Sequence, residues 1–436
     1  MSARPLPTPW NLYNLVASPY FQETLEHAET SLRPLSLFVG RETELRRLRE
    51  TIHGAGEMSS RQAVAGVPGV GKTTLVQELK AAVLADGYLT VDALVPILAK
   101  DTNDGVFGRV LGALYETILV NRPRTVESKA MQDAQLLVRA DRLATGGASF
   151  SAAGFGGGVT RSTTVLTPKD IMIDGPRIMR DLMTLVRQSD ARGVLLHLNN
   201  LENLSDSEAA NAAEVLRSLR DPMMLHDGLH FVLVGTTDAV NAVVNTHVQV
   251  RTVFSVLPLE PLAVADVHRM LAARYEHLRL DGDQPAVPPA ADDAVQGLYE
   301  LFRGDLRGLL KALDDGVGAL IGLAGTDGRA SGSSSGPHVR PLTLEELRPM
   351  LQRRYAAYLW SLPEQVRVEQ LTRWGKKAPG SSQTQKSLMK LWTLTQGAVS
   401  SAISYLVRQG YVVALPRTGG EPIQYVLSGV SRIIFG

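Results

Sequence analysis

Nine consecutive residues carry the clearest chemical signal in this sequence. They are Gly66, Val67, Pro68, Gly69, Val70, Gly71, Lys72, Thr73 and Thr74. Their spacing, G-x-x-x-x-G-K-T, is that of a phosphate-binding loop, in which glycines allow successive backbone N–H groups to face a phosphate. Lys72 is placed to reach the β- and γ-phosphates as a point charge, and the Thr73 hydroxyl is a suitable Mg²⁺ ligand. The pattern therefore predicts that the chain binds ATP together with Mg²⁺.

Acidic side chains are expected at the end of a neighbouring strand, where they hold Mg²⁺ and polarise the attacking water. After the apolar run 193–198 this chain instead has two amides, Asn199 and Asn200, with Glu202 two residues further on. Asn199 can ligate the metal or its water but adds no negative charge, and Asn200 cannot act as a base. We interpret this as a site that binds ATP and hydrolyses it slowly or not at all. Two alternatives stay open: Glu202 supports slow turnover, or the partner strand is a different one.

Three further positions are candidates to act on the phosphates. Thr237 and Asp238 follow the apolar run 229–235 and are placed to contact the γ-phosphate or the attacking water. The alternative for both is a plain exit from a strand. Arg251 precedes a helical region and is a candidate to reach the phosphates of a neighbouring subunit, although a lone arginine is more often a solvated surface residue.

Two shorter patterns add candidate nucleotide contacts. In the sequence GDLR, Asp305 can cap a helix, and Arg307 then lies in its first turn, from which it can swing onto the γ-phosphate. If it does so, the position of that helix depends on the bound nucleotide; the alternative is a capped helix with an exposed arginine. Val39, Gly40 and Arg41 precede a charged helix and complete the candidate nucleotide-binding set.

Alternating strands and helices must position these residues. A short strand at 63–65 leads into the phosphate loop, and a helix at 73–85 leads out and directs its positive end at the phosphates. Continuous apolar runs are typical of buried parallel strands. We expect strands at 88–96, 193–198 and 229–235, and helices at 42–52, 107–120, 128–143, 174–187 and 205–219. The predicted fold class is α/β, with a parallel, doubly wound sheet.

Changes in composition suggest the domain boundaries. Beyond Pro258 the strands stop, and helices at 263–275, 291–302 and 305–323 are enough for a helical lid. Gly/Ser-rich stretches read as linkers or loops. One lies at 146–164 and is either flexible or a hairpin that contacts a partner. We expect an N-terminal extension at 1–35 packed on the following domain, a nucleotide-binding domain at 36–257, a lid at 258–323, a linker at 324–340 and a C-terminal domain at 341–436.

The C-terminal domain has the pattern of a winged helix. Helices at 344–362 and 366–374 precede a helix-turn-helix at 385–392 and 396–409, and strands at 411–415 and 423–427 form the wing. The second helix of the pair is expected to bury its apolar residues, Val407 among them. Its polar residues then face the major groove of duplex DNA. They are Gln396, Ser400, Ser401 and Ser404.

The distribution of charge supports this DNA interpretation. The whole chain has 45 basic and 44 acidic residues, yet residues 341–436 have 12 basic and 5 acidic ones, a net charge of +7 on that domain against −6 on the rest. A basic domain attached to an otherwise acidic chain suggests that the C-terminal domain binds a polyanion. Lys386, Lys390 and Arg417 are candidates to contact backbone phosphate. The alternatives are chance surface variation and a winged helix that docks a protein.

Composition limits the class of protein. The 436 residues are 44% hydrophobic and 20% charged, which is ordinary for a globular chain of several domains. There is no apolar run of membrane-spanning length and no signal-peptide pattern. There is no cysteine, and the nine histidines lack metal-ligand spacing. We therefore expect a cytoplasmic protein without disulfides or a membrane partner.

The ordered set of motifs resembles the AAA+ ATPases, and within them the origin-recognition and helicase-loader initiator group. The resemblance covers roughly residues 36–436 and implies a P-loop AAA+ domain, an α-helical lid and a C-terminal winged helix. It also implies that strand-end acids hydrolyse ATP, that a sensor-1 residue follows the next strand, that Arg251 is a trans arginine finger and that Arg307 is sensor 2. The sequence departs from the family in the amides Asn199 and Asn200, and in Asp238 where sensor 1 is usually Asn, so that Thr237 takes that role.

These observations predict an ATP-binding protein that binds duplex DNA and uses ATP as a switch for assembly, as a homo-oligomer or with partner ATPase subunits through Arg251. A mobile-element or defence system is one setting for such a switch. The alternative is a signalling ATPase of the STAND class, whose winged helix docks an effector protein or inhibits its own chain. That class also has a GVGKTT loop, and the NNLE sequence at 199–202 resembles an amide version of its acidic signature. It usually has a G-L-P motif where this chain has GDLR, which favours the initiator group.

Overall fold

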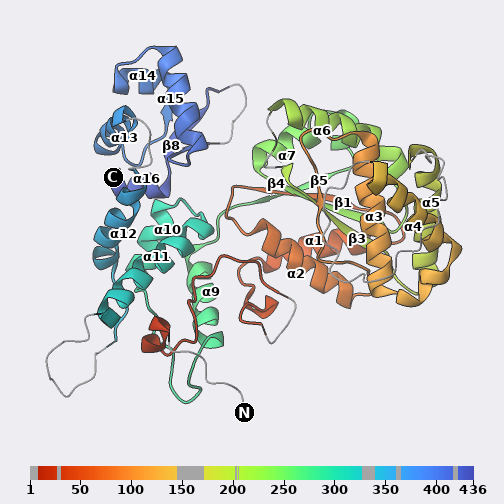
Figure 1. The fold of residues 1–436 in the computed structure, drawn as a ribbon, viewed down its shortest axis with the longest axis horizontal. Helices are drawn as coiled ribbons and strands as arrows, with labels where there is room; N and C mark the ends of the chain where they lie inside the picture. The colour runs from red at the N-terminus through yellow and green to blue at the C-terminus, as the bar shows by residue number, and fades with distance from the viewer. Residues whose placement is uncertain are drawn as a thin grey trace. The chain divides into compact units, whose positions relative to one another are not determined.

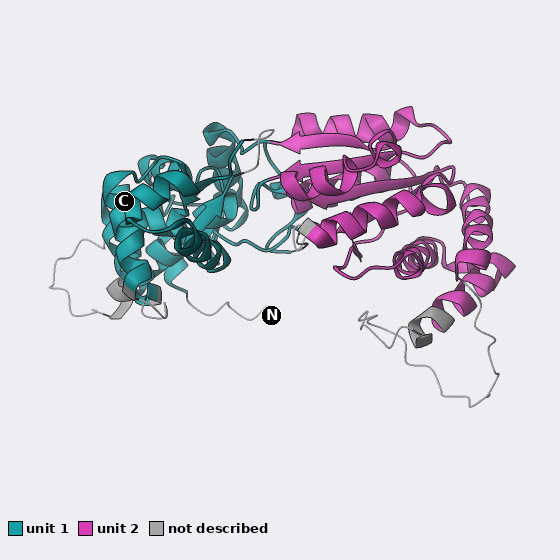
Figure 2. Cartoon of the chain, turned by 90° about the horizontal axis from the view of Figure 1, so that it is seen from above, with its two compact units in different colours: residues 1–40, 67–71, 260–436 teal, residues 41–66, 72–259 magenta. Residues whose placement is uncertain are grey.

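The structure, a computed structural model, describes residues 8–26, 31–144, 171–201, 204, 206–326, 339–359, 365–415 and 421–436. The chain forms two compact units (Figures 1 and 2). Residues 41–66 and 72–259 make the sheet unit, and residues 1–40, 67–71 and 260–436 make the helical unit. The chain therefore passes between the units four times, and two of these passages flank the crest of the phosphate loop, residues 67–71.

The sheet unit is built on five parallel strands in the order β2-β3-β4-β1-β5. Apolar residues fill its interior; all seven residues of β4 are buried, as the predicted fully buried strand requires. Because β4 pairs with both β1 and β3, the carboxyl ends of these three strands share one edge of the sheet. The strands are β1 (Arg61–Gly66), β2 (Val95–Pro96), β3 (Val194–Asn199), β4 (Leu229–Gly235) and β5 (Ser255–Leu259).

Helices cover this sheet, and three of them, α3, α4 and α5, pack against one another in its core. The helices are α1 (Glu42–Gly54), α2 (Lys72–Ala85), α3 (Asn103–Asn121), α4 (Lys129–Ala144), α5 (Ile171–Gln188), α6 (Asp206–Ser218), α7 (Thr237–Val244) and α8 (Val248–Arg251), with a 3₁₀ turn at Pro123–Glu127 and a π turn at Arg220–Met224. The predicted parallel α/β architecture is confirmed.

Two expectations about the strands were wrong. The segment 88–96 is not one strand: Leu89 forms an isolated bridge with Val194, and only Val95–Pro96 pairs in β2. The edge strand β5 was not among the expected strands, and it includes Pro258, the residue beyond which the strands were expected to stop. A proline is tolerated on an edge strand, where its missing N–H removes no bond from a second neighbour.

In the helical unit, α9 (Val264–His277), α10 (Asp292–Leu301), α11 (Leu306–Thr326) and α12 (Leu344–Leu359) share one apolar core. Its buried side chains include Leu298 of α10, Leu313 of α11 and Leu347 of α12. The helix α12 therefore packs with the lid helices, although it follows the predicted linker. Residues 327–338 of that linker and the Gly/Ser-rich segment at 146–164 lie outside the described residues.

A helix-turn-helix with a small antiparallel sheet follows. It comprises α13 (Gln365–Lys377), β6 (Gln383–Thr384), α14 (Gln385–Trp392), α15 (Gln396–Arg408), β7 (Val412–Ala414), β8 (Gln424–Leu427) and α16 (Gly429–Phe435), with the strand order β6-β8-β7. A separate core holds it together, centred on Trp374 and Trp392, whose ring centroids are 6.0 Å apart. These are the elements that the sequence predicted for a winged helix, and we call residues 365–436 the winged helix after that prediction.

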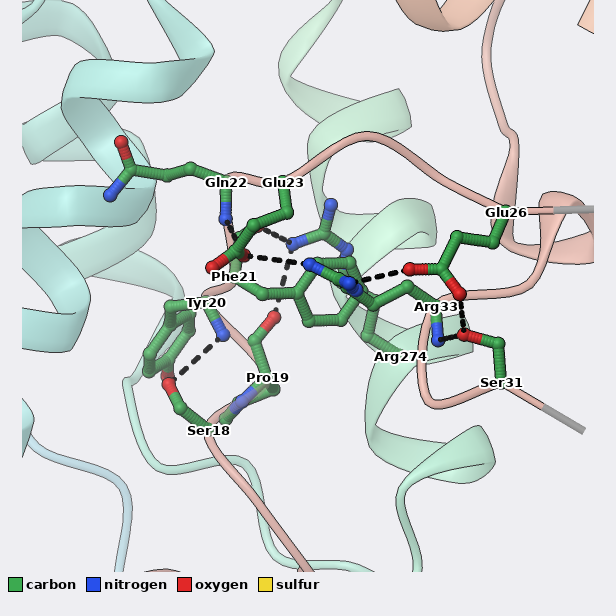
Figure 3. A network of polar contacts seen from close by, with 10 residues as sticks. All are labelled: Ser18, Pro19, Tyr20, Phe21, Gln22, Glu23, Glu26, Ser31, Arg33 and Arg274. Carbon is green, nitrogen blue, oxygen red and sulfur yellow. Dashed lines mark hydrogen bonds and ion pairs between the residues drawn. The ribbon is translucent and has the colours of Figure 1, made fainter. Parts of the chain in front are cut away.

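The N-terminal segment, with 3₁₀ turns at Pro9–Tyr13 and Leu35–Leu37, packs on the lid helices within the helical unit, and not on the following domain as expected. Figure 3 shows how α9 holds it: Arg274 Nη1 donates hydrogen bonds to the carbonyl oxygens of Pro19 (3.1 Å) and Phe21 (2.9 Å), and its guanidinium lies over the Phe21 ring. Burial lowers the pKa of Arg274 to about 10. Tyr13, Tyr20 and Phe21 of the N-terminal segment are thus part of the lid core or packed against it.

Candidate functional site

The phosphate loop has the backbone that its sequence requires. β1 ends at Gly66 and α2 begins at Lys72, as expected. Gly69 and Gly71 have φ of +77° and +93°, in the left-handed region where a side chain would be strained. Lys72 is 9% exposed, and its Nζ donates a hydrogen bond of 2.9 Å to the carbonyl oxygen of Gly66. The ammonium group is therefore held at the base of the loop, within reach of a bound phosphate.

The start of α2 suits an anion. Helix N-termini present unpaired N–H groups and a positive dipole end. The first turn of α2 has no acidic residue that would compete with a phosphate. Thr73 lies in this turn and is partly exposed, so its hydroxyl is available as a Mg²⁺ ligand.

The strand β3 ends at Asn199, at the same sheet edge as Gly66. Asn199 Oδ1 is buried and has no hydrogen-bond partner within the described part of the chain, so its desolvated oxygen is suited to a metal ion or a metal-bound water. Asn200 has φ of +84°, which asparagine tolerates better than most residues. Glu202 lies outside the described residues. The strand itself, VLLHLN, contains no carboxylate.

A buried polar pair lies behind this edge. Lys80 of α2 is 1% exposed, and its Nζ is 3.3 Å from Asp92 O and 3.4 Å from Ala93 O. Burial lowers the pKa of Lys80 to about 8, although the negative charge of Asp92 acts to raise it. Burial first, and then the charge of Lys80, lower the pKa of His197 on β3 well below its usual value. His197 is therefore neutral, and this face of β3 offers the phosphates no negative charge.

At the end of β4, the residue nearest the strand is Thr236, which sequence reasoning passed over. Its hydroxyl accepts a hydrogen bond of 3.3 Å from Ala239 N and caps α7. The predicted Thr237 and Asp238 lie in the first turn of α7, where Asp238 is exposed. The sequence did contain a signal for Thr236: it directly follows Gly235, which ends the apolar run.

The predicted arginines lie in different units. Arg251 is the last residue of α8 in the sheet unit and is exposed. Arg307 is exposed in the first turn of α11 in the helical unit, where Asp305 Oδ1 accepts hydrogen bonds from Arg307 N (3.0 Å) and Gly308 N (3.2 Å). The predicted helix cap at Asp305 is thus present.

The predicted Val39, Gly40 and Arg41 lie at the first passage between the units. Gly40 has φ of +84°, and an added Cβ would lie 2.8 Å from Asp266 Cβ, so only glycine fits there. Arg41 is 5% exposed and forms an ion pair of 2.9 Å with Glu44.

The winged helix exposes the predicted recognition surface. The residues that it exposes are Gln396, Ser400, Ser401, Ser404, Lys386 and Lys390. Val399, Ile403 and Leu406 are buried in its core, whereas Val407 was expected to be buried and is 36% exposed, because the end of α15 extends beyond the core. Arg417 lies outside the described residues.

Comparison with known families identifies the nucleotide-binding part. The sequence profile described as AAA ATPase domain matches residues 37–234. Residues 37–234 are an AAA ATPase domain. The match includes the phosphate loop, Asn199 and almost all of β4, so the AAA+ resemblance is confirmed for these elements of the AAA domain. The search of curated protein sequences found no match.

Solved structures similar to the whole chain include proteins that bind DNA or nucleotides. The Aeropyrum pernix ORC1 protein in complex with DNA is 17% identical, with 91% of this chain and 92% of that chain covered and a TM-score of 0.40. The Aeropyrum pernix ORC2 protein with ADPNP and ADP is 14% identical, with 95% and 97% covered and a TM-score of 0.43. Drosophila ORC bound to DNA is 14% identical, with 100% and 94% covered and a TM-score of 0.42. At these values the function of this chain has to be argued from its own residues.

The structure also limits other kinds of site. Within the described ranges, no three histidine, cysteine, aspartate or glutamate side chains gather as a metal site would require. In the same ranges, no helix combines the length and hydropathy needed to span a membrane.

Proposed function

We propose that this chain is an ATP-binding AAA+ protein of the initiator type, which binds duplex DNA through its winged helix and uses ATP as a conformational switch. One observation carries the proposal: the chain combines an intact phosphate loop, with Lys72 at its base, and a winged helix whose second helix exposes all four of the polar side chains predicted to meet DNA.

The AAA domain supplies the nucleotide contacts. Loop N–H groups and the N-terminus of α2 bind the phosphates, and Lys72 exchanges its bond with Gly66 O for a phosphate oxygen. Thr73 Oγ1 and Asn199 Oδ1 would hold Mg²⁺, which neutralises charge on the β- and γ-phosphates. The buried, unpartnered Oδ1 of Asn199 supports this assignment.

Hydrolysis by this site should be slow or absent. An attacking water needs a group that orients it and accepts its proton. Asn199 and Asn200 supply neither a base nor negative charge, and the facing side of β3 carries neutral His197 beside cationic Lys80. Thr237, Asp238 and Arg307 remain candidates to read the γ-phosphate, and the loop then acts as a nucleotide-holding switch.

The winged helix supplies the DNA contacts. Lys386 and Lys390 lie on α14 and would neutralise backbone phosphates, together with Arg417. The short side chains of Ser400 and Ser401 allow close approach of α15 to the major groove but give modest base readout. Exposed Arg251 is the residue through which an adjacent ATPase subunit would be engaged, either a second copy of this chain or a partner.

The test measures ATP affinity, ATP turnover and duplex DNA binding on the full chain. We expect tight ATP binding, turnover near background and DNA binding that weakens steeply as salt rises. Fast turnover by the native chain would contradict the switch, and absence of DNA binding at low salt would contradict the DNA assignment.

The second candidate is a STAND-type signalling ATPase whose winged helix docks a protein. The anchoring of α16 to the lid through Arg432, whose Nη1 donates to Glu300 O (2.8 Å) and Leu301 O (2.7 Å), is compatible with a docking module. ATP-dependent oligomers that form without DNA and bind no duplex would favour this candidate.

A further inference from the structure

A four-residue turn joins α10 to α11 in the helical unit. It comprises Phe302, Arg303, Gly304 and Asp305, and we call it the α10–α11 turn. Arg303 and Gly304 both have positive φ, 55° and 80°. Gly304 N donates to Tyr299 O (3.1 Å), and an added Cβ at Gly304 would collide with Pro261. A non-glycine residue in the left-handed region persists only where its surroundings fix the conformation, so the turn is a rigid element.

One side of this turn contacts the crest of the phosphate loop, which belongs to the same unit. An added Cβ at Gly69 would collide with Asp305 Oδ1 and lie 3.4 Å from Arg307 Cβ. The carboxylate oxygen that caps α11 therefore rests directly on the loop backbone. A triphosphate bound by the loop brings negative charge towards Asp305, and like charges at close range repel.

The other side contacts the winged helix. Arg303 Nη2 donates a hydrogen bond of 2.8 Å to Gly380 O, in the segment before β6. The ring of Phe302 lies against Gly429, the first residue of α16, so closely that an added Cβ at Gly429 would collide with it. Only glycine therefore fits at position 429 in this contact.

The helix α16 belongs to both cores of the helical unit. Ile433 is fully buried in the lid core, whereas Phe435 packs against the winged-helix core. Gly375 of α13 leaves no room for a side chain beside Phe435. Arg432 of the same helix donates to the last two carbonyl groups of α10, of which Glu300 O also accepts a hydrogen bond of 3.1 Å from Arg303 N in the turn. A displacement of the α10–α11 turn is therefore passed to the winged helix by close-packed contacts.

We propose that the α10–α11 turn transmits the occupancy of the phosphate loop to the winged helix, so that nucleotide binding changes the affinity for duplex DNA. The proposal rests on the proposed function and adds the path by which its two sites communicate. Asp305 receives the signal, and Phe302, Arg303 and Arg432 pass it on.

The experiment uses the full chain, ATPγS as the nucleotide and a labelled DNA duplex. The coupling factor is the ratio of the DNA dissociation constants measured without nucleotide and with saturating ATPγS. We expect a change of at least about fivefold for the native chain. Arg303→Ala and Arg432→Ala should each bring this factor towards one, while binding of either ligand alone stays within about threefold. Asp305→Asn keeps the helix cap without the charge, so it should bind ATPγS more tightly and couple more weakly.

Arg279→Ala is the matched control, because Arg279 lies just after α9 and its side chain pairs with Glu276 of α9. It should couple like the native chain. Hydrogen exchange of α16 upon ATPγS addition gives a readout without DNA, and it should change in the native chain and not in Arg303→Ala. Native-like coupling and exchange in both variants would overturn the path. Failure of the native chain to bind ATPγS or DNA in the single-ligand titrations would instead reject the proposed function.

Discussion

Lys72 Nζ and the carbonyl oxygen of Gly66 are 2.9 Å apart, so the ammonium group that we propose to bind phosphate is hydrogen-bonded to the loop's own backbone. This bond holds a nearly buried charge in place, and under the proposal it is exchanged for a bond to phosphate. The loop is thus preorganised, and its affinity depends on an ammonium group that needs little reordering.

Replacing this lysine should separate binding from folding. Lys72→Met removes a charge-assisted hydrogen bond to phosphate, worth about 2 kcal/mol, or roughly thirtyfold in ATP affinity by calorimetry. The free energy of unfolding should change by less than about 1 kcal/mol, because a buried charge and its bond disappear together. Lys129→Met on the exposed surface of α4 is the control, and equal losses of affinity in both variants would contradict the assignment.

The two amides after β3 should respond differently to acidic replacements. Asn199→Asp supplies charge where Oδ1 lacks a partner, so Mg²⁺-dependent ATP affinity should rise and turnover should become measurable. Asn200→Glu puts a longer side chain at φ +84°, which should lower the free energy of unfolding by about 1 kcal/mol. Steady-state ATPase assays and urea unfolding of each single variant check this. If turnover is unchanged in Asn199→Asp and in the double variant Asn199→Asp with Asn200→Glu, the lack of hydrolysis has a cause other than these two amides.

A buried histidine should make the AAA domain sensitive to acid. His230 Nδ1 accepts from Ser60 N at 3.2 Å, while burial, and then the charge of Arg61, lower the pKa of His230 to about 4. The unfolded chain binds the proton at a higher pH, near 6.5, so stability is fully present above that value and falls as pH drops towards 4, by up to about 3 kcal/mol.

Urea unfolding between pH 7 and 4 measures this effect. His230→Asn keeps an acceptor for Ser60 and should make the profile shallower, with a lower stability at pH 7; buried His197, whose pKa is also lowered, keeps part of the acid sensitivity. His277→Asn, at the exposed end of α9, should leave the native profile intact. A profile that is equally steep in His230→Asn would show that other groups cause the acid sensitivity.

The lysines on α14 should control DNA affinity without base preference. Removing both charges, Lys386→Ala with Lys390→Ala, should weaken binding to all duplexes alike and lower the salt slope by about two. Lys129→Ala, which also removes an exposed positive charge, should leave the slope unchanged. Fluorescence anisotropy over a salt series measures both the affinity and the salt slope. An equal effect of Lys129→Ala would show that DNA binding depends on the net charge of the chain and not on an interface at α14.

The N-terminal segment should be needed for the lid. Tyr20 is 1% exposed, and its hydroxyl oxygen lies 3.3 Å from that of Tyr275. Tyr20→Ala empties a large volume and should cost about 3–5 kcal/mol, whereas Tyr20→Phe should cost about 1 kcal/mol. Thermal unfolding of the full chain measures both, and near-native stability of Tyr20→Ala would show that the segment is only loosely attached.

The elements that sequence predicted well are those whose signal is local. The phosphate loop, α2, β3, β4 and the helix-turn-helix each combine a strong apolar pattern with a glycine or a capping residue. The cap at Asp305 and the exposed face of α15 followed from the same kind of pattern.

The parts that sequence missed depend on distant partners. A proline argues against a strand unless the strand is known to lie at the edge, which only the strand order β4-β1-β5 reveals. The destination of Tyr20 and Phe21 depends on Arg274, some 250 residues later in the chain. The backbone conformation of Asn200 is set by how β3 ends, and its residue type does not predict this conformation.

The alternation of the chain between its two units governs the order in which the protein can form during synthesis. Residues 41–66 and 72–259 of the sheet unit leave the ribosome as nearly one block, so this unit can fold while translation continues. The helical unit takes its first forty residues from the N-terminus and the rest from residue 260 onward. The aromatic residues of the N-terminal segment must therefore wait, unburied, until α9 to α11 have been made. We expect the nascent chain to depend on chaperones during this interval. A circular permutation that shortens the delay should raise the yield of folded protein.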